Sequence, residues 1–242
     1  AAIVEAASAV PYRSVLDIGT GTGRMLQLLG NGVARAVGLD SSHSMLAVAR
    51  SNLERAEVRR VDLRQGDVYS PPFERDSFDL VVIHQVLHFL DDPARAVREA
   101  VRTLAPGGRI LIVDFAPHTL EFLRTEHAHR RLGFRADIVS AWLEQAGLAV
   151  DAVRTLESPD EGAERLTVTL WLASDQRVDR TDAEQVLGAN IHRAADSPIY
   201  DASAAGDDEA IALYQQQLVG DVLQGGRRLV TVMTTFDRCV GA

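Results

Sequence analysis

The sequence of 242 residues has no lysine, one cysteine and no long apolar run. All 25 of its basic residues are arginine. Cys239 has no second cysteine to pair with, so an internal disulfide is excluded and a thiolate-based metal site within one chain is not expected. No stretch approaches the roughly 20 apolar residues that cross a bilayer, and no signal peptide precedes the first apolar segment. These absences favour a cytoplasmic protein without a membrane partner.

Positive charge is also scarce, since the formal net charge at pH 7 is −9. Binding to DNA or RNA relies on neutralising many phosphates with cations, so we expect this chain alone to bind no nucleic acid. The hydrophobic fraction of 46% provides for one sizeable core and a smaller appendage. Composition therefore agrees with a soluble enzyme.

Three alternating glycines follow the first apolar strand. Residues 15–18 form the short apolar run of a strand that is buried on both faces, and residues 24–29 begin a helical pattern. Gly19, Gly21 and Gly23 lie in the turn between them, where glycine permits positive φ and close approach of a ligand. The pattern predicts a nucleotide-like cofactor site, and the alternative is a structural turn without a ligand.

Two carboxylates follow later strands of the same pattern. Asp40 ends an apolar segment about twenty residues beyond the glycines, where it can accept both hydroxyls of a ribose. Its alternative role is to cap the helix that starts near residues 41–44. Asp67 could accept from an adenine amino group while Val68 lies on the ring, although an Asp after a glycine is also ordinary turn chemistry.

Strands and helices alternate along the first two thirds of the chain, which predicts a doubly wound α/β fold with a parallel sheet. Ligands of such sheets bind at the carboxyl ends of the strands. Pro106, Gly107 and Gly108 are expected to form a tight turn with a purely structural role. The parallel strands are expected near 15–18, 35–39, 58–61, 79–83 and 109–113, and two more near 148–156 and 165–173.

The chain resembles the class I S-adenosylmethionine-dependent methyltransferases from residue 15 to about 173. The motifs that carry the resemblance are Asp-x-Gly-x-Gly-x-Gly at 17–23, Gly-Leu-Asp-Ser-Ser-x-x-Met-Leu at 38–46, Gly-Asp-Val at 66–68, and the segments 77–88 and 104–114. The Gly-x-Gly-x-x-Gly spacing of dinucleotide dehydrogenases is absent.

The resemblance implies a seven-stranded, mostly parallel Rossmann-like sheet whose last two strands form an antiparallel pair at the edge. It also implies S-adenosylmethionine as cofactor and S-adenosylhomocysteine as product. The cofactor-binding residues it implies are Asp17, Gly19, Thr20, Gly21, Gly23, Asp40, Ser41, Met45, Asp67, Val68 and His84.

His84 and His88 are the candidate catalytic residues. They are four positions apart, so a helix that began at His84 would place both on one face above the cofactor. Either imidazole could act as a general base, since it titrates near neutral pH. Alternatively, His84 contacts the cofactor only through its backbone and His88 is a hydrogen-bonded helix residue.

A second histidine group lies in the segment 115–134, which we expect to shape the acceptor pocket. His118, Glu126, His127 and His129 have the chemistry of metal ligands without a convincing spacing, so no metal is predicted. With segment 84–88, this segment resembles methyltransferase domains that follow an arsenic-repressor-type winged-helix region in bacterial regulators. The motif at 77–88 also resembles quinone-type C-methyltransferases. We expect these residues to be part of a longer protein that carries an amino-terminal lid or winged-helix region.

Residues 175–242 form a predicted appendage to a methyltransferase domain over 1–174. Capping signals predict helices from Thr181 to about 194 and from Asp207 to about 224, followed by a strand over 228–235. A segment this short does not easily build its own core, so it is expected to dock on the domain or to form a homodimer.

The sequence thus predicts a methyltransferase that acts on a small-molecule acceptor. Two alternatives remain open. One is a non-catalytic module that senses S-adenosylmethionine or S-adenosylhomocysteine for a transcriptional regulator, and the other is a nucleotide-binding oxidoreductase.

Overall fold

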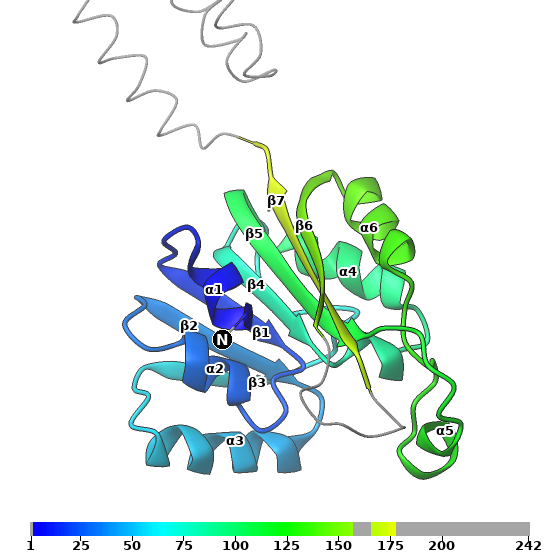
Figure 1. The fold of residues 1–242 in the computed structure, drawn as a ribbon. Coiled ribbons are helices and arrows are strands. Elements are labelled where there is room, and N and C mark those ends of the chain that lie inside the picture. The colour runs from blue at the N-terminus through cyan, green and yellow to red at the C-terminus, as the bar shows by residue number, and fades with distance from the viewer. Residues whose placement is uncertain (1, 157–165, 178–242) are drawn as a thin grey trace, which may run out of the picture. The chain divides into compact units, whose positions relative to one another are not determined.

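The computed structural model describes residues 2–156 and 166–177, where strands alternate with helices as predicted (Figure 1). The chain divides into two units, residues 1–176 and 177–242. The helices predicted from Thr181 and Asp207 and the strand predicted over 228–235 lie outside the described residues.

One seven-stranded sheet organises the described part of the chain, with the strand order β3-β2-β1-β4-β5-β7-β6. β7 is antiparallel to both of its neighbours, and the pairs among β1 to β5 are all parallel. The predicted doubly wound fold and the antiparallel pair at the sheet edge are therefore confirmed. The strands are β1 (Ser14–Ile18), β2 (Arg35–Asp40), β3 (Val61–Gln65), β4 (Phe78–His84), β5 (Leu104–Phe115), β6 (Leu148–Leu156) and β7 (Val168–Asp175).

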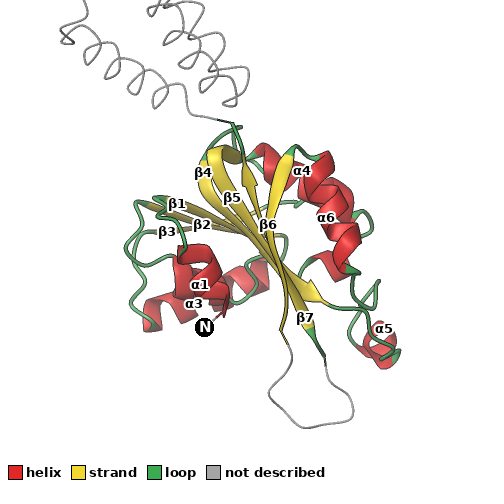
Figure 2. Cartoon of the chain, turned by 45° about the horizontal axis from the view of Figure 1, so that its top comes forward, coloured by secondary structure: helices red, strands yellow, loops and turns green. Residues whose placement is uncertain are grey.

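Helices cover both faces of the sheet (Figure 2). Side chains from α1, α2 and α3 join one core cluster, and side chains from α4 and α6 join the other. The strand order reverses between β1 and β4, and ligands of such sheets bind at the carboxyl ends of the strands beside this reversal. The helices are α1 (Ala2–Ser8), α2 (Arg24–Leu29), α3 (His43–Arg55), α4 (Pro93–Arg102), α5 (Phe122–Glu126) and α6 (Ala136–Gln145), with a 3-10 turn η1 (Leu87–Phe89).

The third strand does not lie where the sequence predicts it. Val58 ends the turn after α3, its N–H donates to the carbonyl of Leu53, and its side chain is buried. Glu57 before it and Arg60 after it take positive φ, so the strand begins only at Val61. The strand predicted over 58–61 is wrong, because the apolar side chain of Val58 packs in the core after α3 and Val58 is not part of the sheet.

The predicted tight turn at 106–108 lies inside β5. Phe78 pairs with Leu104, and Leu80 already pairs with Arg109, so the intervening residues bulge out of the strand. Gly107 takes a φ of 72° within this bulge. Strand β5 is thereby longer than predicted, and the predicted turn residues form a bulge within it.

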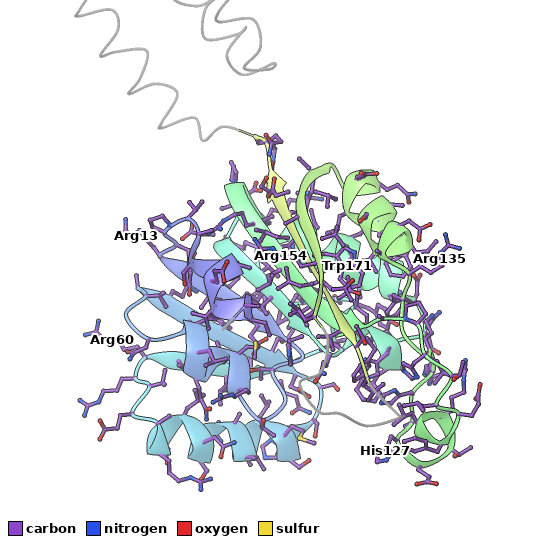
Figure 3. All side chains as sticks on the ribbon, in the orientation of Figure 1. Arg13, Arg60, His127, Arg135, Arg154 and Trp171 are labelled. Carbon is purple, nitrogen blue, oxygen red and sulfur yellow. The ribbon has the colours of Figure 1, made fainter. Side chains whose placement is uncertain are left out.

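Trp171 ties the antiparallel strand β7 to helix α6 (Figure 3). Its side chain is fully buried, and its Nε1–H donates to the carbonyl of Ala136 at 3.0 Å. None of the helices in the described ranges has the length and apolar character needed to cross a membrane.

Candidate functional site

The glycine loop, residues 19–23, joins β1 to α2 through three residues with positive φ: 71° at Gly19, 52° at Gly21 and 81° at Gly23. A Cβ on Gly19 would lie 2.4 Å from Cγ2 of Val86, and one on Gly23 would lie 3.2 Å from Cβ of Ala49. A Cβ on Gly21 would meet nothing closer than 3.9 Å. Packing therefore requires the outer two glycines, whereas the space at Gly21 leaves the backbone open to a ligand.

Asp40 ends β2 and faces the glycine loop. One carboxylate oxygen accepts from the N–H of Gly21 and the other from the N–H of Ser42, both at 2.8 Å. The cap of α3, considered above as an alternative role for Asp40, is supplied by Ser42, whose hydroxyl accepts from the N–H of Met45. Each carboxylate oxygen keeps a lone pair that could accept from a ribose hydroxyl.

Asp17 lies in the centre of the sheet beneath the same loop and is 1% exposed. The hydroxyl of Thr20 donates to its carboxylate at 2.6 Å. Burial raises the pKa of Asp17 to about 7, the Thr20 hydrogen bond opposes this shift, and the charge of Asp40 adds to it. Asp17 therefore changes charge near neutral pH.

Asp67 and Val68 lie next to Asp40, because the N–H of Gly66 donates to the Asp40 carbonyl at 3.0 Å. The carboxylate of Asp67 accepts from the N–H of Tyr69 at 2.9 Å, which is the turn role considered as its alternative. Asp67 remains exposed, and Val68 packs against the core.

Ser41 and Met45 lie on the exposed side of the same region. The carbonyl of Ser41 accepts from the side chain of Gln65, and the Met45 side chain is 45% exposed. The predicted cofactor-binding residues therefore lie at or just beyond the carboxyl ends of β1, β2, β3 and β4.

His84 and His88 do not share a helix face, and that prediction is wrong. His84 is the last residue of β4. Gln85 then takes a φ of 55° and donates its N–H to the carbonyl of Val113, so the backbone leaves β4 without entering a helix. His88 lies in η1 instead. Burial lowers the pKa of His84, and the charge of Asp114 opposes this shift.

Asp114 pairs with His88 in a fully buried contact that the sequence prediction missed. Nδ1 of His88 lies 2.8 Å from one Asp114 oxygen, and the N–H groups of Leu87 and Phe115 also donate to this carboxylate. A carboxylate accepts, so the bond assigns the proton to Nδ1 and leaves a lone pair on Nε2 of the neutral ring. The sequence signal for this contact is Asp114 itself, an acidic residue directly after the apolar run 110–113.

The segment 116–134 lies directly against His88, whose carbonyl accepts from the N–H groups of Arg130 and Arg131 at 3.0 and 3.2 Å. His129 is buried, and His127 is exposed beside α5 (Figure 3). Among the described residues, no group of three His, Cys, Asp or Glu side chains is arranged to hold a metal ion.

Comparison with known proteins agrees with this arrangement. A family model described as a methyltransferase domain matches residues 16–112. The uncharacterized methyltransferase YcgJ of Bacillus subtilis is 38% identical over 104 residues, which are 43% of this chain and 41% of that protein. The demethylmenaquinone methyltransferase of Renibacterium salmoninarum is 30% identical over 164 residues, which are 61% of this chain and 67% of the relative. The chain belongs to the class I S-adenosylmethionine-dependent methyltransferases.

The solved structure of YcgJ shows the same methyltransferase fold. Its TM-score is 0.60 at 21% identity, and the match covers 73% of this chain and 97% of that one. The sequence matches are shorter, since this chain spans about two fifths of the length of curated YcgJ. The predicted family resemblance is confirmed, and S-adenosylmethionine is the cofactor of this family of enzymes.

The residues of the site fit that cofactor. Gly21 leaves room that a side chain would fill, and Asp40 offers charged acceptors beside it. Asp17 is a buried carboxylate whose ionised form a nearby cation would favour, and S-adenosylmethionine carries an ammonium and a sulfonium. The structure thus places one carboxylate at the glycine loop and a second, buried carboxylate beneath it.

The raised pKa of Asp17 predicts a pH-dependent stability. Between about pH 4 and pH 7 the folded state holds a proton that the unfolded state has released, so stability falls as pH rises through this window. Relative to Asp17→Asn, the cofactor-free protein should lose roughly 2–4 kcal/mol of unfolding free energy between pH 4 and pH 8. Urea titrations of both proteins across this range measure the difference. Parallel pH profiles would show that folding does not raise the pKa of Asp17.

Proposed function

We propose that this protein transfers the methyl group of S-adenosylmethionine to a small-molecule acceptor. The observation that carries the proposal is the contact between Val86 and Gly19. This contact places the segment that bears His84 and His88 against the glycine loop. Bound S-adenosylmethionine supplies an activated methyl group, so the protein has mainly to orient the acceptor and exclude water.

Within this proposal, His88 is the residue that holds a proton during turnover. Asp114 fixes its Nδ1–H, and Nε2 can then take a proton from the acceptor. His84 stays a second candidate, since it ends β4 beside the same carboxylate and is only partly buried. Its lowered pKa keeps the ring neutral near pH 7, as a general base requires.

Turnover is tested by incubating the protein with methyl-labelled S-adenosylmethionine and a bacterial metabolite extract. Label in a small-molecule product is the expected result. Binding of S-adenosylmethionine without any labelled product would favour the sensing module of a regulator. Calorimetric binding of NAD without binding of S-adenosylmethionine would instead support an oxidoreductase.

Asp40→Ala should weaken S-adenosylmethionine binding by about 1.5–3 kcal/mol, the range for a lost hydrogen bond to a charged group. Isothermal titration calorimetry measures this as a roughly 10- to 150-fold rise in Kd. Asp62→Ala is the matched control, since Asp62 lies on neighbouring β3 and pairs with exposed Arg64. An unchanged affinity of the Asp40 variant would refute the ribose role.

The remaining proposals concern the protein as a whole. The net charge of −9 supports a small acceptor rather than nucleic acid. We further propose a bacterial, cytoplasmic protein in which residues 1–174 bind the cofactor. Residues 175–242 dock on this domain or mediate a homodimer, because so short a segment does not readily form an independent core.

A further inference from the structure

Three histidines and two phenylalanines gather above the carboxyl end of β5 in what we term the histidine cluster: His88, Phe89, Phe115, His118 and His129. The ring of His129 stacks on Phe115 at 5.6 Å between centroids and lies 4.2 Å from the ring of His88. His118 meets Phe115 edge-on at 5.9 Å. The cluster combines residues of η1, β5 and the segment that follows β5.

Two ring nitrogens of this cluster have no hydrogen-bond partner although they are buried. They are Nε2 of His118 and Nδ1 of His129, and the described residues contain one other such side-chain atom, on Arg109. His129 as a whole is only 9% exposed. Unpaired buried polar atoms are costly, so two of them in one cluster point to a ligand that pairs with them.

The protonation of His118 indicates what this ligand offers. Nδ1 of His118 accepts from the N–H of Leu120 at 3.3 Å, so the neutral ring carries its proton on Nε2. The unpaired Nε2 is therefore a donor that needs an acceptor atom. On the other side of the cluster, Nδ1 of His129 becomes a second donor when that ring is protonated.

An anionic oxygen can counteract the lowered pKa values of the two rings, which a neutral oxygen does not do. Burial lowers the pKa of His118 and of His129, and a positive charge on His88 would lower both further. A bound anion would reverse this effect and favour a protonated ring. The other charged groups that act on these two rings are Glu121, Arg124 and His127 of the same segment and Asp114 of β5.

The cluster also lies beside the glycine loop, and one of its members, Phe89, is exposed to solvent. Val86 packs on Gly19, and His88 follows two residues later. The ring of Phe89 contacts the rings of His88 and His129 at 4.0 and 5.2 Å and is itself 44% exposed. Because both unpaired nitrogens are buried, a small acceptor would reach them once a covering side chain such as the exposed Phe89 moved aside.

We propose that His118 and His129 bind an anionic oxygen of the methyl acceptor, a carboxylate or a phenolate, and that one proton is taken up with it. This inference rests on the proposed function, since it assigns the acceptor class of that site. It adds two binding residues and a charge requirement that the sequence motifs do not specify.

Calorimetry on the full chain with simple probes tests the proposal without turnover. Benzoate and 4-nitrophenolate represent the two sources of the anion, and benzamide is the neutral counterpart of benzoate. At pH 7.5, at least one anion should bind about tenfold or more tightly than benzamide. Titrations in triethanolamine and in Tris, two cationic buffers whose ionisation enthalpies differ, should reveal uptake of up to one proton.

Substitutions of His118 and His129 test whether these two rings cause the anion binding and the proton uptake. His129→Phe and His118→Phe should each weaken the anion by about tenfold or more and reduce the proton uptake. His129→Gln keeps a polar side chain if the phenylalanine variant fails to fold, and it should likewise reduce the uptake. The control is His127→Phe, because His127 is exposed on the same segment.

Equal binding of benzamide, absence of binding by both anions, or an equal effect of His127→Phe would overturn the proposal. So would binding of zinc that depends on His118 and His129, because a metal would then account for the unpaired nitrogens. Binding of S-adenosylmethionine and label transfer are measured separately. Their failure would remove the methyltransferase assignment even where the anion site is confirmed.

Discussion

Gly19→Ala is expected to cost the folded protein about 2–5 kcal/mol of unfolding free energy, the largest effect of any methyl group added to the glycine loop. The left-handed backbone at Gly19 accounts for about 1–2 kcal/mol of this cost. The rest comes from overlap with Val86, whose Cγ2 would lie 2.4 Å from the new methyl group. Urea unfolding of the variant measures the sum.

A control and a double variant separate these two terms. Gly32 has a φ of 81°, and a Cβ added there would meet no atom within 4 Å, so Gly32→Ala should show the backbone cost alone. In a Val86→Ala background, Gly19→Ala should recover roughly 1–3 kcal/mol, because the crowding methyl groups are gone. Strictly additive effects would mean that Val86 does not press on the glycine loop. The contact that joins the segment bearing His84 and His88 to the glycine loop would then be disproved.

The strands and the glycine loop were predictable because their signals are local. The apolar runs that form β1 and β2 end in a glycine turn and in Asp40, and positive φ is a property of the glycines themselves. β3 was misplaced because it is a short edge strand with only two apolar residues, both at most partly buried, whereas the buried Val58 just before it belongs to the turn after α3.

The part of the site that carries His84 and His88 was less predictable because contacts between distant segments determine it. The left-handed turn at Gln85 depends on a hydrogen bond to Val113, which no local pattern reveals. Likewise, the pairing of His88 with Asp114 joins residues 26 positions apart. The chemistry of these side chains was visible in the sequence, whereas their mutual geometry was not.

Asp114→Ala is expected to destabilise the protein by about 3–5 kcal/mol, because it leaves three donors unpaired in the core. These are Nδ1–H of His88 and the N–H groups of Leu87 and Phe115. Asp114→Asn keeps the shape and one acceptor oxygen, so it should cost less stability. The asparagine amide no longer fixes the Nδ1–H tautomer of His88, so label transfer should fall by roughly 100-fold or more. Binding of S-adenosylmethionine should change little.

Asp79→Asn is the matched control for this variant. Asp79 lies in β4 at the far end from the site, and its carboxylate also accepts three donors: the N–H groups of Arg13 and Ser14 and the hydroxyl of Ser14. The Asp79→Asn variant should be less stable but should keep label transfer, because the hydrogen bonds of Asp79 support only the fold. If Asp114→Asn kept both the turnover rate and its pH profile, His88 would have no proton to move. The buried pair would then serve only to anchor η1 on β5, and the proton would have to pass through His84.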